Sequence, residues 1–483
     1  MLFNTLSYVL FLIVIVAAYW VLRPSWRVWL LLGASLLFYA LWRWEFVALI
    51  AFSAFVDYYF SLRIHDETRP KWRKAFLVMS LSTNLGLLAY FKYAYFLRDN
   101  VAGVGDLLGQ SWRFDMWDIL LPLGISFYTF LSVSYTVDVY RGLFTPVRNF
   151  WTYLTYVMFW PHMIAGPILR AEELLPQLTR SIRFDSDAFT SGIRKILFGL
   201  FMKVGIADQI APYVNEAFLA NPAQLSALDV WTMSFAFGLQ IYFDFSGYGM
   251  IAIGSAALMG IHFPENFNWP YLATSPRDFW RRWHITLSSW IRDYLYLPLS
   301  GARFRGQSEG GLDVQVLRPD SWRLTLSLFL TWFLMGLWHG AAWTFAVWGL
   351  WHAVFIWLYR VTSPRLDGVP LVIRNVGGWA LTISITMLAW IPFRAQSLGD
   401  AFTLWGRIFD IHAYTHLTFR ENFYLIVAVV FGGMIALYFA QGLLARMNDR
   451  PARWTVEVFS MAIVIFVVFI FLRPVEQFIY FQF

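Results

Sequence analysis

The chain has 483 residues, of which 59% are hydrophobic and only 14% are charged, with a formal net charge of +7 and no cysteine. A soluble domain carries about 25% charged residues, so this composition excludes a soluble protein and indicates an integral membrane protein. The absence of cysteine excludes disulfides, cysteine nucleophiles, thiolate metal sites and palmitoylation. We expect no bound metal, no permanently bound cofactor and no nucleic-acid partner.

Apolar runs recur along the chain, each long enough to cross a hydrocarbon core of about 30 Å as a helix. We predict an all-α, polytopic membrane helix bundle with about eleven helical segments, some short or interrupted. Short loops join the segments, so we expect one integral membrane domain over residues 1–483. Leu6 to Leu22 is expected to remain as the first span, because it lacks the features of a cleavable signal.

The distribution of charge between neighbouring loops predicts the orientation in the membrane. Residues 63–74 are rich in lysine and arginine, which favours the cytoplasmic side. Residues 98–118 are acidic and are expected outside. The span from Ala75 to Leu97 separates the two loops, and this alternation places the N-terminus on the outer side.

Further along the chain, Val28 to Leu62 is typical of two short spans hinged near Trp42 to Glu45. Another span is predicted over Leu120 to Tyr140. The stretch Phe159 to Pro167 contains prolines and a glycine that prevent a regular helix, and such backbone at membrane depth is tolerated where it is buried or lines a cavity. His162 in this stretch is a candidate cavity residue, although a structural role is favoured.

Asp244 lies within Asp229 to Phe263, an apolar segment longer than one span. A carboxylate flanked by aromatic residues there must have a partner or contact water. We predict Asp244 as a substrate-binding residue. A buried structural partner for an arginine or a backbone donor is the alternative.

A helix is predicted to start at Ser275, where a serine N-cap is followed by Pro276 and Asp278, and to end near Pro298 and Gly301. On the helical period, one stripe is mostly aromatic: Trp280, Trp283, Leu287, Trp290 and Tyr294. A second stripe is basic and polar: Arg277, Arg281, His284, Ser288 and Arg292. Such a helix is expected in the membrane interface. Its arginines, among them Arg281 and Arg282, suit anionic lipid headgroups or the phosphate-bearing part of a thioester donor.

The run from Leu334 to Trp343 places His339 within an apolar segment, Leu324 to Val361. Ionisable groups inside membrane segments are candidates for function. Gly336 and Gly340 bracket His339 and leave room beside the imidazole, and Trp338 and Trp343 are predicted to wall this substrate-binding space. The alternatives are a histidine that only hydrogen-bonds a neighbouring helix and glycines that only pack helices. His352, further along, is interpreted as structural.

Four stretches, namely 160–170, 240–254, 278–301 and 336–351, closely resemble the bacterial polysaccharide-modifying branch of the membrane-bound O-acyltransferase family. The resemblance runs over nearly the whole chain, and Phe279-Trp280-Arg281-Arg282-Trp283-His284 followed by Gly336-Leu337-Trp338-His339-Gly340 is its most specific part. It implies a helix bundle, with short interfacial and re-entrant helices, around a central funnel or tunnel.

The resemblance also implies roles for two histidines. His339 falls on the position of the catalytic histidine of the family, and His284 falls on its other prominent histidine. The family usually continues Asp-Phe-Ser-Gly-Tyr with Ser-Asp, whereas Gly249 and Met250 follow Tyr248 here. A second acidic group is therefore missing.

These observations predict an O-acyltransferase of the bacterial inner membrane. We expect His339 to act as general base while acetyl-CoA or an acyl-carrier thioester enters past Arg281, Arg282 and His284 from the cytoplasm. The acceptor is expected to be a hydroxyl of an exported polysaccharide, reached directly or through a periplasmic, esterase-like partner protein. The alternatives are a lipid or protein acceptor, a transporter, and a non-catalytic subunit of a polysaccharide export machine.

Overall fold

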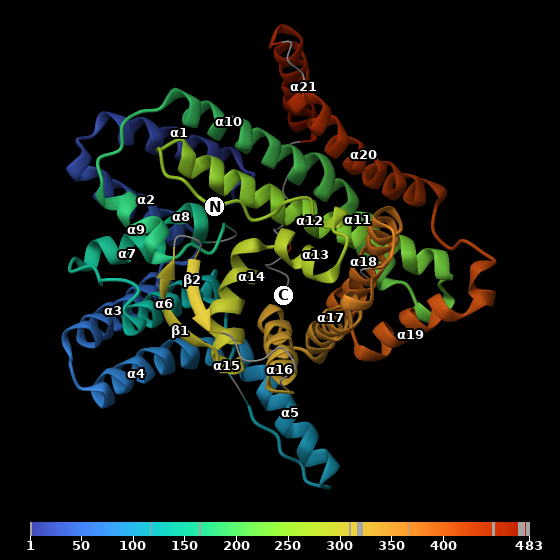
Figure 1. Cartoon of the computed structure of the whole chain (residues 1–483), viewed down its shortest axis with the longest axis horizontal. Helices are drawn as coiled ribbons and strands as arrows, with labels where there is room; N and C mark the ends of the chain where they lie inside the picture. The colour runs from blue at the N-terminus through green and yellow to red at the C-terminus, as the bar shows by residue number, and fades with distance from the viewer. Residues whose placement is uncertain are drawn as a thin grey trace. The chain divides into compact units, whose positions relative to one another are not determined.

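The computed structural model describes residues 2–115, 117–163, 166–308, 311–315, 322–366, 368–446, 450–471 and 479. These residues are almost entirely helical, which confirms the all-α prediction (Figure 1). One small exception is a two-stranded antiparallel hairpin of β1 (Arg303–Ser308) and β2 (Gly311–Gln315).

The chain divides into two compact units, and the first comprises Met1–Ile193, Ala252–Pro264 and Trp290–Arg318. Its helices are α1 (Leu6–Val21), α2 (Pro24–Arg43), α3 (Glu45–Asp66), α4 (Pro70–Leu88), α5 (Ala94–Leu107), α6 (Ile125–Arg141), α7 (Phe150–Met158), α8 (Trp160–Met163), α9 (Ala171–Thr179) and α15 (Leu297–Ser300). A π-helical turn, η1 (Ala89–Tyr93), joins α4 to α5, and a second, η5 (Arg292–Tyr296), precedes α15. Within this unit α3, α4 and α6 pack against one another (Figure 1).

The second unit comprises Arg194–Ile251, Glu265–Ser289 and Pro319–Phe483. Its helices are α11 (Asp208–Leu219), α13 (Pro276–Arg282), α16 (Trp322–His339), α17 (Trp343–Thr362), α18 (Leu371–Arg394), α19 (Leu398–Phe409), α20 (Glu421–Arg446) and α21 (Arg450–Phe471). Short 3₁₀ turns are η3 (Pro222–Gln224), η4 (Pro270–Leu272), η6 (Ser363–Leu366) and η7 (Ile411–Tyr414). The chain passes between the units within α10 (Ser186–Leu200), α12 (Ala227–Ala257) and α14 (Ile285–Ile291). That the whole chain acts as one domain stays a prediction.

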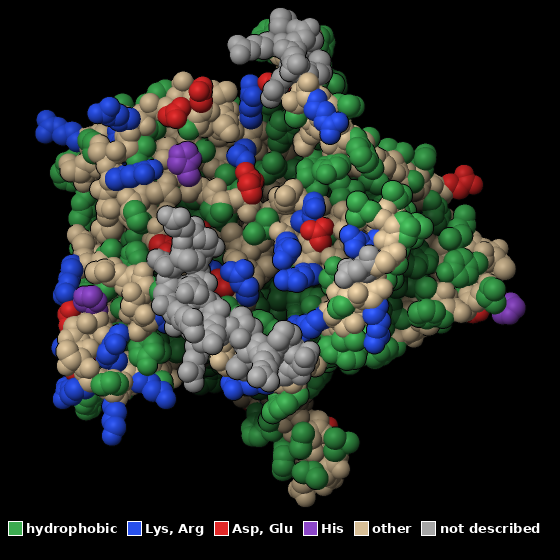
Figure 2. Space-filling view, in the orientation of Figure 1, with side chains coloured by type: hydrophobic (Ala, Val, Ile, Leu, Met, Phe, Trp, Pro, Cys, Tyr) green, Lys and Arg blue, Asp and Glu red, His purple; other side chains and the backbone are tan. Residues whose placement is uncertain are grey.

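Seven helices of the described residues are long and apolar enough to cross a membrane. They are Pro24–Arg43, Glu45–Asp66, Pro70–Leu107, Ser186–Leu219, Leu371–Arg394, Glu421–Arg446 and Trp454–Phe471. Figure 2 shows hydrophobic side chains over much of the visible surface, and α20 exposes Leu425, Val429 and Phe439 by more than 60% each. Apolar exposure on this scale fits contact with lipid. The protein is a multi-pass membrane protein.

Two predicted boundaries can be compared with the structure directly. The hinge near Trp42 to Glu45 is confirmed, because α2 ends at Arg43 and α3 begins at Glu45. The span predicted from Leu120 begins as a helix only at Ile125. Gly124 adopts φ 73° and a Cβ there would lie 2.6 Å from the carbonyl oxygen of Met163, so the chain turns at this glycine before the helix starts.

Candidate active site

His339 is the last residue of α16, in the second unit, and a short turn leads from it to Trp343, the first residue of α17. The two helices form a close hairpin because glycines face each other across it. A Cβ on Gly336 would lie 2.2 Å from the carbonyl oxygen of Phe345, and a Cβ on Gly349 would lie 2.1 Å from that of Trp332. The helix-packing role that the sequence left open for Gly336 is therefore real.

The imidazole of His339 is surrounded by aromatic rings and is only 5% exposed. Ring centroids lie 4.8 Å away for Trp338, 4.9 Å for Trp348 and 5.4 Å for Phe393. The Trp348 ring stands almost perpendicular to the imidazole, at 83°. The side chains that make these three ring contacts are apolar or uncharged, so His339 lies in an aromatic environment.

The two tryptophans predicted to wall the space beside His339 differ in position. Trp338 is buried and contacts His339. Trp343 is 49% exposed, and its ring lies 6.4 Å from that of Phe333. Gly340 is covered by the Phe345 ring, because a Cβ there would lie 2.1 Å from Phe345 Cε2. The substrate-binding roles of Trp338 and Trp343 stay predictions.

His284 lies where the helix that starts at Ser275 is interrupted. The cap is as predicted: Ser275 Oγ accepts from the backbone N–H of Asp278 at 3.1 Å, with Pro276 at the first helical position. The prediction of one helix to Pro298 is wrong, because α13 ends at Arg282 and His284 adopts φ 43°. His284 is 0% exposed. It therefore does not belong to an exposed basic stripe.

The aromatic stripe of this region faces the protein interior, since Trp280, Trp283 and Trp290 are all at most 7% exposed. The arginines differ from one another. Arg281 is exposed, whereas Arg282 is half-buried and its Nε donates to Asp278 Oδ1 at 3.0 Å. Arg281 is thus the more available of the two predicted donor-binding residues.

Aromatic side chains connect the surroundings of His339 with those of His284 inside the second unit. From His339 the path of ring contacts runs through Phe393 to Trp390, at 5.4 Å, and on to Trp283, at 5.2 Å. Trp283 directly precedes His284. The two predicted catalytic histidines thus border one aromatic core.

Asp244 is buried in α12 with strong partners. Lys203 Nζ lies 2.7 Å from Asp244 Oδ1 and 2.7 Å from Asp208 Oδ1, and the backbone N–H of Ile479 donates to Asp244 Oδ2 at 2.7 Å. The π-helical turn η2 (Phe201–Ala207) carries Lys203. Close approach at Gly199, where a Cβ would lie 2.6 Å from the carbonyl oxygen of Gly247, brings α10 against α12. These contacts give Asp244 a structural function, and substrate binding by it stays a prediction.

The other buried histidines have structural partners. His162 Nε2 lies 3.0 Å from the carbonyl oxygen of Tyr156. Trp280 Nε1 donates to His352 Nδ1 at 3.3 Å. Both contacts agree with the structural interpretation of these residues.

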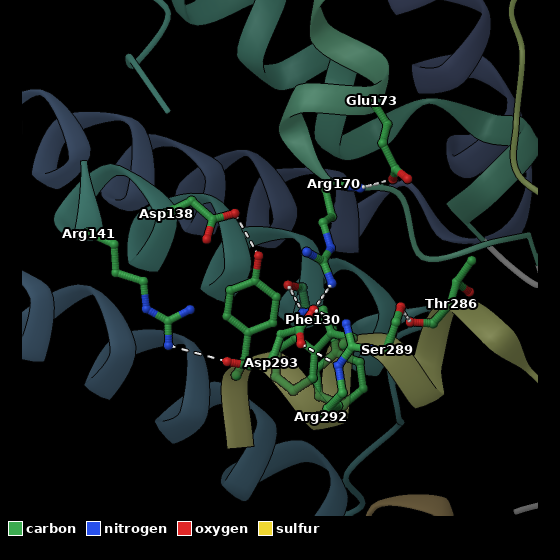
Figure 3. A network of polar contacts seen from close by, with 11 residues as sticks. Phe130, Asp138, Arg141, Arg170, Glu173, Thr286, Ser289, Arg292 and Asp293 are labelled. Carbon is green, nitrogen blue, oxygen red and sulfur yellow. Dashed lines mark hydrogen bonds and ion pairs between the residues drawn. The ribbon is translucent and has the colours of Figure 1, made fainter. Parts of the chain in front are cut away.

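The first unit holds a polar network that the sequence did not suggest (Figure 3). Arg170 donates to Asp293 Oδ2 at 2.5 Å, Arg292 Nε donates to Asp293 Oδ1 at 2.6 Å, and Tyr294 donates its hydroxyl to Asp138 at 2.6 Å. The network fixes the π-helical turn η5 onto α6 and the start of α9. No local pattern predicts it, because Asp138 and Arg170 lie far along the chain from their partners Tyr294 and Asp293.

The comparison with known proteins identifies the family of the chain. The model of the membrane-bound O-acyltransferase family matches residues 79–314. The chain is 39% identical to a probable alginate O-acetylase, AlgI, of Azotobacter vinelandii, over 84% of this chain and 77% of that protein. It is 34% identical to a peptidoglycan O-acetyltransferase of Helicobacter pylori, over 78% of this chain and 72% of that protein.

A teichoic acid D-alanyltransferase of Bacillus subtilis is similar over a shorter stretch, 33% identical over 49% of this chain and 58% of that protein. The similarity to the first two relatives extends over most of both chains. The chain is therefore an O-acyltransferase and belongs to the membrane-bound O-acyltransferase family.

Proposed function

We propose that the protein is an O-acetyltransferase of the bacterial inner membrane that moves an acetyl group from a cytoplasmic thioester to hydroxyls of an exported polysaccharide. Two relatives that match most of the chain are named for O-acetylation, one of alginate and one of peptidoglycan. An acetyl group is therefore the acyl group to expect, and a polysaccharide is the class of acceptor. Alginate is the first acceptor to test.

The observation that carries the proposal is the environment of His339. Its imidazole is buried among Trp338, Trp348 and Phe393 at the break between two helices. A neutral imidazole accepts a proton well near neutral pH. In such surroundings it is suited to take the proton from an acceptor hydroxyl as the oxygen attacks.

The reaction then follows from this assignment. The hydroxyl oxygen forms a bond to the thioester carbonyl carbon while its proton passes to His339. The tetrahedral intermediate collapses, the carbon–sulfur bond breaks, and the thiolate leaves and takes the proton back from His339. We assign His284 as the second catalytic group, at the far end of the aromatic core.

The donor is proposed to bind near Arg281 and Arg282. Guanidinium groups are good partners for phosphate, which both coenzyme A and a phosphopantetheine arm carry. Exposed Arg281 is the better placed, because Arg282 is already paired with Asp278. The acetyl group reaches the outside acceptor directly or through a periplasmic esterase-like partner.

Cells that lack the native gene provide the test. The strain is complemented with the wild type or with His339→Ala, and acetyl ester is measured separately in polysaccharide, lipid and protein fractions. We expect ester in the polysaccharide to return only with the wild type. Ester in the lipid or protein fraction would favour those acceptors instead. Full acetylation by correctly inserted His339→Ala would favour a non-catalytic export subunit.

A further inference from the structure

Asn266 lies in the segment that connects α12 to α13, in the second unit. It forms hydrogen bonds that stabilise the strained turn at His284. It is 2% exposed. Its backbone carbonyl oxygen accepts from the N–H of Ile285 at 2.9 Å. Its side-chain Oδ1 accepts from the backbone N–H of Thr286 at 3.2 Å and from Thr286 Oγ1 at 2.9 Å, and it lies 3.2 Å from His284 Nδ1. The φ of 43° at His284, unusual for a residue with a side chain, is kept by these bonds.

These contacts determine which atom of the amide faces the imidazole. A backbone N–H can only donate, so the atom that meets Thr286 N must be the oxygen of the Asn266 side chain. That oxygen can only accept, so His284 Nδ1 must donate to it. The proton of His284 is therefore on Nδ1.

The opposite nitrogen of His284 is the one available to a substrate. The hydrogen-bond and ring contacts that the structure describes for His284 come from Asn266, Phe245 and Phe267, none of which is charged. A fully buried imidazolium without a counter-ion would be costly, so the ring is neutral. In a neutral ring with Nδ1–H, Nε2 carries a lone pair. Within the described part of the chain, this buried Nε2 has no hydrogen-bond partner.

We propose that Asn266 is a positioning residue that holds His284 as the neutral Nδ1–H tautomer, so that Nε2 accepts a hydrogen bond from an O–H or N–H of the reacting molecules. The identity of that donor group rests on the proposed function. His284 is thus an acceptor in the resting enzyme and not a basic group for phosphate. Asn266 is not assigned to any contact with the substrate, because it acts through His284.

The tautomer can be measured directly and without substrate. The protein is labelled with ¹⁵N-histidine, placed in lipid bilayers and studied by solid-state NMR, and the His284→Gln variant identifies the His284 signals by their loss. We expect a protonated Nδ1 and an unprotonated Nε2. A protonated Nε2 in the wild type would overturn the proposal.

Three variants separate positioning from a general structural effect. Asn266→Leu removes the acceptor, so we expect mixed tautomers and a fall in kcat of about 100-fold with an unchanged KM for the donor. Asn266→Asp keeps an acceptor oxygen and should keep Nδ1 protonated, which makes it informative if the leucine variant does not fold. Thr286→Val removes a hydroxyl bond to the same Oδ1 without touching the imidazole, and should keep both tautomer and kcat.

The two proposals fail in different ways. If the wild type transfers no acetyl group, the proposed function is wrong while the NMR result still decides the tautomer. If Asn266→Leu keeps the wild-type tautomer and kcat, the positioning role of Asn266 is wrong whatever the acceptor is.

Discussion

The two candidate catalytic histidines differ in their surroundings. His339 packs against aromatic rings, while the His284 imidazole donates one hydrogen bond to a buried amide oxygen. The side-chain oxygen of Asn266 can only accept a hydrogen bond, so it fixes the protonated nitrogen of His284. This arrangement suits His284 to accept a hydrogen bond at Nε2, while catalysis by His339 as general base stays a proposal.

Arg281 is expected to contribute to donor binding by contacting a phosphate group of the donor. Arg281→Gln removes a charge-assisted hydrogen bond, worth about 1.5–3 kcal/mol, so KM for acetyl-CoA should rise about tenfold or more. Acetyl-pantetheine, which lacks phosphate, provides the control and should show an unchanged KM. Arg282→Gln should have a smaller effect. An equal rise in KM for both donors would show that Arg281 does not bind phosphate.

Lys203 is predicted to be a stability residue. It is buried between Asp244 and Asp208, and removing one partner of a buried pair leaves an uncompensated charge that costs about 3–5 kcal/mol. Lys203→Met should therefore lower the thermal unfolding temperature strongly in detergent. The double variant Lys203→Met with Asp244→Leu should recover part of the loss. No recovery would mean that the pair itself is not the source of stability.

The α16–α17 hairpin is the element that positions His339, because His339 is the last residue of α16. Its glycines allow the backbones to approach closely. A larger residue must push the helices apart and so displace the imidazole from its aromatic neighbours. The position of His339 thus depends on packing within the last two turns of α16.

Substitution of these glycines tests this dependence. Gly336→Ala would place a Cβ 2.2 Å from a backbone oxygen, and overpacking of this kind costs about 1–3 kcal/mol or more. We expect lower thermal stability and lower kcat. Gly432→Ala in α20 is the matched control, since a Cβ there meets nothing within 4 Å. Equal stability and activity of the two variants would contradict the packing argument.

The interruption at His284 shows why the length of the helix that starts at Ser275 could not be predicted from the sequence. The cap at Ser275 is local, and it was predicted correctly from Ser275, Pro276 and Asp278. The periodic pattern continues past residue 284, so it predicts one helix. The break depends on Asn266, which lies 18 residues earlier in the chain. The helical periodicity of the sequence contains no information about such a tertiary contact.

For the whole molecule, composition and apolar run length predict the multi-helix membrane fold, because the bilayer imposes length and polarity on each span. The ion-pair partners of buried charged residues could not be predicted in the same way. Asp244 stood out as a carboxylate in an apolar run, yet its partner Lys203 lies on a π-helical turn of another segment. A charged residue within an apolar segment can be located from the sequence, but its ion-pair partner can be identified only from the folded structure.

The absence of cysteine makes the predicted orientation easy to test. Single cysteines are introduced as Lys71→Cys, in the loop expected inside, and Asp115→Cys, in the loop expected outside. An impermeant maleimide applied to intact spheroplasts should label only the second. Because basic loops favour the cytoplasm, labelling of Lys71→Cys alone would reverse the orientation.

The most direct test of His339 as the general base uses purified protein in liposomes with radiolabelled acetyl-CoA and a carbohydrate acceptor. Wild type, His339→Gln and His352→Asn are compared at equal thermal stability, His352→Asn serving as the control for loss of a buried histidine in the same hairpin. We expect label on the acceptor with the wild type and His352→Asn, and about 100-fold less with His339→Gln. Transfer by His339→Gln at the wild-type rate would contradict catalysis by this histidine.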